Sequence, residues 1–146
     1  MIGGNVYQQI LHPTDLSDDH FEVCAKAVKI AHQLKATLHL LHVIEPPTTL
    51  QIAQSLGFAD IEKQNAQQSD AIAVMKTLGE ALNIPPEHQC VVMGPINTSV
   101  WKKINEWSIS LIIIGSHTPH LLPSFLEGTA QDMAQNAPCD VLTIRS

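Results

Sequence analysis

The sequence has 146 residues, of which 45% are hydrophobic and 15% charged, a composition typical of one soluble globular domain spanning residues 1–146. A formal net charge of −6 disfavours a nucleic-acid partner, because phosphate backbones are bound by basic surfaces. No stretch approaches the ~20 apolar residues of a membrane span, and the first residues lack the basic and apolar regions of a signal peptide. We therefore expect a cytoplasmic protein that contacts neither membrane nor nucleic acid.

The first half of the chain alternates between strand and helix patterns. The run Gln9–Pro13 predicts a strand, and Ser17 is a plausible N-cap for the helix after it. The apolar residues of this helix recur at helical spacing and predict one inward stripe: Phe21, Cys24, Ala25, Val28, Ala31 and Leu34. Thr37–Ile44 predicts the second strand.

The second half continues this alternation. Apolar residues at helical intervals from Ile61 to Leu82 predict a long helix, which the Pro85-Pro86 pair ends. Three further strands are predicted at Cys90–Met93, Leu111–Gly115 and Asp140–Arg145. A helix capped by Asn97 or Thr98 separates the first two of these strands, and a helix opened by Gly128-Thr129 separates the last two. The alternation indicates βαβ units, and hence a largely parallel sheet with helices on both faces.

The three cysteines, Cys24, Cys90 and Cys139, are widely spaced and form no Cys-x-x-Cys pair. They predict neither a disulfide framework nor a zinc site, and we expect them to be small buried hydrophobes. His39 and His42 lie three apart on a predicted strand, so their side chains point to opposite faces and do not share a metal. His117 and His120 flank a proline in a loop with no third ligand nearby. No metal site is predicted.

Ligands of open parallel sheets bind beyond the carboxyl ends of the strands, where the strand order reverses. Pro13, Thr14 and Asp15 follow the first predicted strand. Gly115 ends the fourth, where the missing side chain allows a close approach of backbone to ligand. Further on, Gly128-Thr129 presents backbone N–H groups and a hydroxyl at a helix N-terminus, a setting that favours anions.

Three motifs together resemble the universal stress protein family: ILHPTDLS at residues 10–17, LLHVIE at 40–45, and IIIGSH at 112–117 followed by GTAQDMAQNAPCDVLTI at 128–144. The resemblance covers essentially the whole chain. It implies a three-layer, Rossmann-like α/β fold, with a doubly wound five-stranded parallel sheet in the order 3-2-1-4-5. It also implies a homodimer. Some members of the family bind ATP or another adenine nucleotide, and others do not.

The members that bind ATP share a glycine, two residues, a second glycine, nine residues, and a glycine followed by serine or threonine. Here Gly115 begins the pattern, Thr118 stands at the second glycine, and Gly128-Thr129 ends it. By this resemblance, Asp15 accepts hydrogen bonds from the ribose hydroxyls. The nucleotide-binding residues implied in this way are Pro13, Thr14, Asp15, Val43, Ile114, Gly115, His117, Gly128 and Thr129, with Pro13 and Val43 beside the adenine, Ile114 and Gly115 in the floor, and Gly128 and Thr129 on the phosphate.

Two residues depart from the pattern. Thr118 carries a side chain where the family has glycine, and Glu127 places a negative charge beside the expected phosphate contact. A bound Mg²⁺, or His117 and His120, would soften that repulsion. The departures keep open a second function, that of a protein-interaction module without a nucleotide.

The leading hypothesis is a universal stress protein that binds ATP or another adenine nucleotide, with or without Mg²⁺, and acts as a nucleotide-responsive dimer. The apolar last strand, Val141 to Ile144, lies at a sheet edge in the expected order and is predicted to join two subunits. No catalytic residue is predicted, and slow ATP hydrolysis is the most that the sequence allows. A phospho-acceptor receiver domain is excluded, because the third and fifth strands end in VVMGPIN and TIRS, without the required aspartate and lysine.

Overall fold

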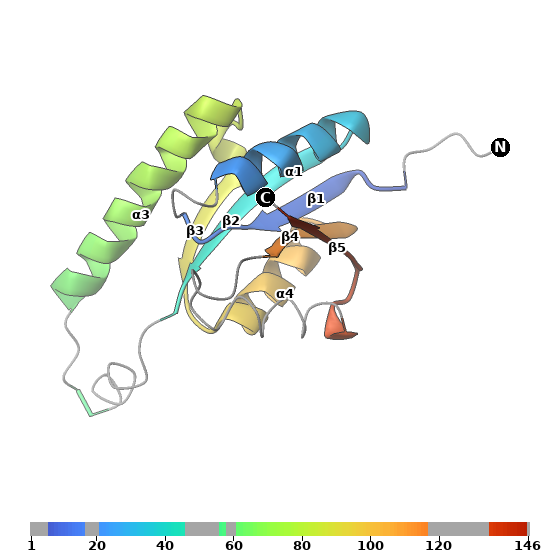
Figure 1. Ribbon diagram of the computed structural model, residues 1–146. Helices are drawn as coiled ribbons and strands as arrows, with labels where there is room; N and C mark the ends of the chain where they lie inside the picture. The colour runs from blue at the N-terminus through green and yellow to red at the C-terminus, as the bar shows by residue number, and fades with distance from the viewer. Residues whose placement is uncertain (1–5, 17–20, 46–55, 58–60, 117–134, 146) are drawn as a thin grey trace.

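The computed structural model describes residues 6–16, 21–45, 56–57, 61–116 and 135–145. Within them, parallel strands form a five-stranded sheet in the order β3-β2-β1-β4-β5, which confirms the predicted topology (Figure 1). The strands are β1 (Gln9–Pro13), β2 (Thr37–Ile44), β3 (Gln89–Met93), β4 (Leu111–Ser116) and β5 (Asp140–Arg145). Their bounds match the predicted runs to within one residue.

Helices cover both faces of this sheet, as predicted (Figure 1). Helices α1 (Phe21–Gln33) and α3 (Ile61–Leu82) lie on one face, which we call the α1 face. Helix α4 (Ile96–Glu106) lies on the other, the α4 face. A short 3-10 helix, η2 (Pro86–His88), leads into β3. The described helices and the sheet thus form three layers.

Successive residues of a strand point to opposite faces, so the central strands supply two apolar cores. On the α1 face, Ile10, Leu40 and Ile113 pack against residues of α1 and α3. On the α4 face, the neighbouring residues Leu11, Leu41 and Ile112 pack against Val100 and Ile104 of α4. Because β1, β2 and β4 are covered on both faces, their sequences are nearly continuous apolar runs.

The inward stripe of α1 differs from the prediction. The buried residues of the helix are Val23, Cys24, Ala27 and Ala31, whereas Phe21 at the helix start is 43% exposed. Cys24 and Ala31 were predicted correctly, but Phe21 and Leu34 lie at the two ends of the helix, where the sheet covers them less. The small side chains of Ala27 and Ala31 allow α1 to approach the sheet closely.

The start of α4 also differs from the prediction. Gly94 turns the chain with a φ of +149° after β3, and Pro95 occupies the N-cap position with a φ of −63°. No side chain caps the helix there, so the predicted caps Asn97 and Thr98 are wrong. The ring of Pro95 fixes its φ ahead of the first helical residue but carries no acceptor for the N–H groups of the first turn.

Within the described parts of the chain, every helix falls short of the length or the apolarity that a membrane span requires. The predicted cap Ser17 and the helix expected to open at Gly128-Thr129 lie outside those parts.

Candidate functional site

The strand order reverses between β1 and β4, whose carboxyl ends therefore form the switch point of the sheet. Paired positions between these two strands stop at Leu11 and Ile112. Two residues further on, Pro13 has no N–H to donate, so the β1 side of this ladder has no donor at that position. The backbone pairing thus ends before the strands do, beside the residues predicted to bind a ligand.

His12 joins the two strands where their backbone pairing stops. Its side chain is fully buried, and its Nδ1 lies 2.7 Å from the carbonyl oxygen of Ile113. A carbonyl oxygen only accepts, so Nδ1 carries the proton and donates it. The sequence analysis missed this contact. The available signal was an ionisable residue in the middle of a buried apolar strand.

Thr14 continues the pairing of β1 with β2 past the end of the strand, because its N–H donates to the Leu41 carbonyl at 2.8 Å. Its hydroxyl oxygen accepts a hydrogen bond from the N–H of Leu16 at 3.1 Å, which closes a tight turn. Leu16 adopts a φ of +62°, a left-handed conformation that is rare for leucine. This turn carries Asp15, half-buried, at the switch point.

Cys24 of α1 packs against the same turn. Its thiol is a free, buried group 3.6 Å from the Thr14 hydroxyl oxygen. Burial raises the pKa of Cys24 to about 11, and the negative charge of Asp15 also raises it. The thiol therefore stays protonated at neutral pH and serves as packing, as predicted, while Cys90 and Cys139 are only half-buried.

The residues predicted beside the adenine and the floor residue Ile114 fall on a single face of the sheet. Val43 and Ile114 belong to the apolar cluster of the α4 face, which also holds Leu11. Pro13 lies two residues beyond Leu11 on β1 and so projects to the same face. Gly115 is buried beside them and pairs with Ile144 of β5. The structure thus brings Pro13, Val43, Ile114 and Gly115 to one edge of the sheet.

Three of the predicted nucleotide-binding residues, His117, Gly128 and Thr129, lie outside the described residues. The departures from the glycine pattern, Thr118 and Glu127, lie outside them as well.

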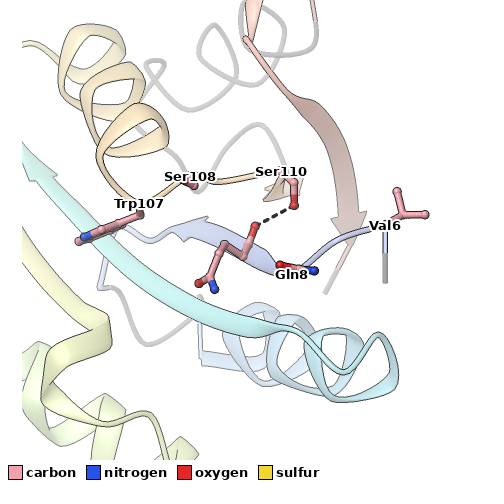
Figure 2. Close-up of a pocket in the computed structure, with 6 residues that line it drawn as sticks. Val6, Gln8, Trp107, Ser108 and Ser110 are labelled. Atoms are coloured by element: carbon pink, nitrogen blue, oxygen red, sulfur yellow. Dashed lines mark hydrogen bonds between the residues drawn. The ribbon is translucent and has the colours of Figure 1, made fainter. Parts of the chain in front are cut away.

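A separate pocket of about 480 Å³ lies at the opposite, amino end of the sheet (Figure 2). Among the described residues its lining is uncharged and consists of Val6, Gln8, Gln9, Trp107, Ser108 and Ser110. The indole of Trp107 already stacks on His39 at 4.8 Å between ring centroids, and Lys103 Nζ lies 4.8 Å from its centre. An uncharged lining and an engaged ring suit a phosphate-bearing ligand poorly.

His39 is the buried titratable group beside this pocket. Only 7% of it is exposed, and its Nε2 donates to the Gln9 side-chain oxygen at 2.7 Å. Its Nδ1 has no hydrogen-bond partner among the described residues. His42, by contrast, contacts the Thr14 carbonyl at the carboxyl end of the sheet. The two rings thus form their hydrogen bonds at opposite ends of the sheet.

Acid is expected to destabilise the fold through His39. Burial, and to a lesser degree the nearby charge of His88, lower the pKa of His39 from 6.5 to about 4. Between pH 6.5 and 4 the unfolded chain binds a proton at this residue that the native protein does not bind, so stability falls as pH falls through that window. Urea unfolding at several pH values should show that the free energy of unfolding of wild type falls by up to ~3 kcal/mol more than that of His39→Gln over this range. Equal pH dependence of the two proteins would contradict the assignment.

Comparison with known proteins shows the family of this chain. The family model described as "Universal stress protein family" matches residues 6–145. The chain belongs to the universal stress protein family. Universal stress protein A homolog 2 of Coxiella burnetii is 29% identical over 120 residues, 82% of each chain. Homolog 1 from the same organism is 28% identical over 138 residues, covering 94% of this chain and 96% of its own.

Solved structures agree with this membership. The structure of the hypothetical protein MJ0577 is similar to this universal stress protein with a TM-score of 0.72 and 25% identity, over 97% of each chain. A universal stress protein solved in complex with cAMP has a TM-score of 0.66 over 95% of this chain and 97% of its own. At 16% identity, the second similarity shows the fold alone.

Proposed function

We propose that this universal stress protein binds ATP or another adenine nucleotide at the carboxyl ends of β1 and β4, and acts in the cytoplasm as a nucleotide-responsive dimer. One observation carries the proposal: the turn Thr14–Leu16 holds a half-buried carboxylate, Asp15, at the switch point of the sheet. Ligands of doubly wound sheets bind at this position. A relative with the same fold was solved with an adenine nucleotide, cAMP.

Two groups of described residues support the proposal. Pro13 and Val43 are half-buried apolar residues proposed to lie beside the adenine, with Ile114 in the floor, while Asp15 offers an acceptor for the ribose hydroxyls. In this proposal Gly115 lets the ligand approach the backbone, with Thr14 and His117 nearby, and Gly128 and Thr129 hold the phosphates.

Mg²⁺ is proposed only as a companion of the triphosphate. Among the described residues no group of three or more histidine, cysteine or acidic side chains is placed to hold a metal ion. A magnesium ion bound with ATP would accordingly take most of its ligands from phosphate oxygens and water. The proposal contains no chemical step and assigns no catalytic residue.

The proposed dimer forms through β5, the edge strand of the described sheet. Leu142 is 37% exposed there, and an apolar edge strand is a template for pairing. Leu142→Lys is expected to convert a dimer into a monomer, because charge on an edge opposes pairing while the monomer core keeps Ile144. Size-exclusion chromatography with light scattering measures the mass; a monomeric wild type, or a dimeric variant, would contradict this interface.

A thermal melt with nucleotide tests the proposed binding. A ligand at 100 times its dissociation constant stabilises a protein by ~2.7 kcal/mol, which for a chain of this length raises the melting temperature by several degrees. Millimolar MgATP should give this shift in nucleotide-free protein, and MgGTP a smaller one. No shift with either nucleotide would favour the second function, a protein-interaction module.

A further inference from the structure

His42 of β2 is tied to the turn that carries Asp15. The half-buried ring places Nδ1 2.7 Å from the carbonyl oxygen of Thr14. A carbonyl oxygen cannot donate, so the proton lies on Nδ1 of His42. The N–H of the same threonine donates to Leu41, the residue before His42. Adjacent residues of β2 thus hold both backbone polar groups of Thr14.

The position of the Thr14 carbonyl helps to set the direction in which the Asp15 side chain projects. The peptide unit is planar, so the Thr14 carbonyl oxygen lies in one plane with the nitrogen and Cα of Asp15. A hydrogen bond that holds the oxygen therefore orients the plane from which the Asp15 side chain projects.

Leu16, the residue after Asp15, shows that contacts hold the turn in a backbone conformation that leucine disfavours. Leu16 has a φ of +62°, and its N–H is retained by the Thr14 hydroxyl at 3.1 Å. Non-glycine residues persist in such conformations when surrounding contacts over-determine them. The bond from His42 is one of those contacts, and it comes from a different strand.

We propose that His42 is a positioning residue of the nucleotide site, which holds the Thr14 carbonyl and thereby aims the Asp15 carboxylate at the ribose hydroxyls. This inference rests on the proposed nucleotide binding. It assigns His42 no contact with the nucleotide itself. Removal of His42 should therefore reduce the preference for a nucleotide that carries ribose hydroxyls over one that lacks them, in addition to any general loss of affinity.

The test compares the affinities of MgATP and of 2′,3′-dideoxy-ATP with Mg²⁺, measured by titration calorimetry. In wild type, hydrogen bonds from the ribose to a carboxylate should make ATP bind at least ~10-fold more tightly than the dideoxy compound. His42→Leu removes the donor and should bring this ratio close to 1. His42→Asn should keep the ratio, because its amide nitrogen is as many bonds from Cβ as Nδ1 is.

His39→Leu is the matched control. This histidine lies on the same strand, ~10 Å from His42, and its side chain bonds to Gln9 instead of the turn. The control should lower the melting temperature without changing the ratio of affinities. If leucine at position 42 prevents folding, His42→Gln replaces it, since its amide nitrogen lies one bond further from Cβ and should also lower the ratio.

The outcomes separate the two claims. A wild type that binds ATP with the expected ratio, together with an unchanged ratio in His42→Leu, overturns the role of His42 and leaves nucleotide binding standing. An equal loss of the ratio in His42→Asn overturns it too. A wild type that binds no ATP overturns the proposed function, and the inference with it. Loss of the ratio in His42→Leu with retention in His42→Asn is the expected result.

Discussion

Asp15→Ala is expected to weaken ATP binding by ~10- to 100-fold, the effect of losing hydrogen bonds to a charged acceptor. The carboxylate stands at the switch point on a turn held by the Thr14 hydroxyl and by His42 of β2, where it meets the ribose in the proposed complex. The turn itself is tied through Thr14, whose backbone and hydroxyl remain in the variant. We therefore expect the affinity to change far more than the melting temperature.

Asp140→Ala is the matched control for Asp15→Ala. It removes the same charge, but from the amino end of β5, where Asp140 accepts a hydrogen bond from the Tyr7 hydroxyl at 2.8 Å. Titration calorimetry should give this variant the wild-type affinity for ATP. An Asp15→Ala protein that binds ATP as tightly as wild type would place the nucleotide elsewhere or deny the ribose contact.

Ile112→Ala is expected to lower the free energy of unfolding by ~3–4 kcal/mol, within the range measured for large-to-alanine changes in cores. Ile112 is fully buried in β4, where it pairs with Leu11 and Val141 on its two sides. Its side chain packs in the cluster that joins the sheet to α4. Close neighbours on both strands and on the helix limit how far the cavity left by the side chain can collapse.

Urea unfolding measures this change, and Ile72→Ala provides the comparison. Ile72 is also an isoleucine, but it lies on α3 and is 51% exposed. Its truncation should lower the free energy of unfolding by less than half as much as that of Ile112. Similar losses for the two variants, at unchanged dependence on urea, would contradict the description of the α4 face as a closed core.

The strand bounds were predictable because buried parallel strands are continuous apolar runs that polar residues, prolines and glycines interrupt. Pro13 ends β1, and Gly94-Pro95 separates β3 from α4. The order of the strands came from the family resemblance and not from the runs themselves. The α1 stripe was placed wrongly at Phe21 and Leu34, since helical spacing alone does not show how far a sheet extends over the ends of a helix.

The location of the candidate site in the sheet was predictable, but the hydrogen bonds of its residues were not. The strand order implied by the family resemblance placed Asp15 and Gly115 beside one another at the switch point. Sequence reasoning missed His12 and the bond of His42, because each of these rings reaches a backbone carbonyl more than 25 residues away in the chain. Such contacts depend on strand order and register, which a single sequence does not reveal. Strand alternation correctly separated His39 from His42, since that inference needs only local geometry.

The most direct test of the account is to locate the nucleotide by NMR, following backbone amide signals while MgATP is added to isotope-labelled protein. Shifts are expected at the carboxyl ends of the strands, at Asp15, Val43 and Gly115. Signals of Gln8, Ser108 and Ser110, which line the pocket at the amino end, should stay in place (Figure 2). Shifts confined to that pocket, or none at millimolar MgATP, would contradict a nucleotide site at the switch point.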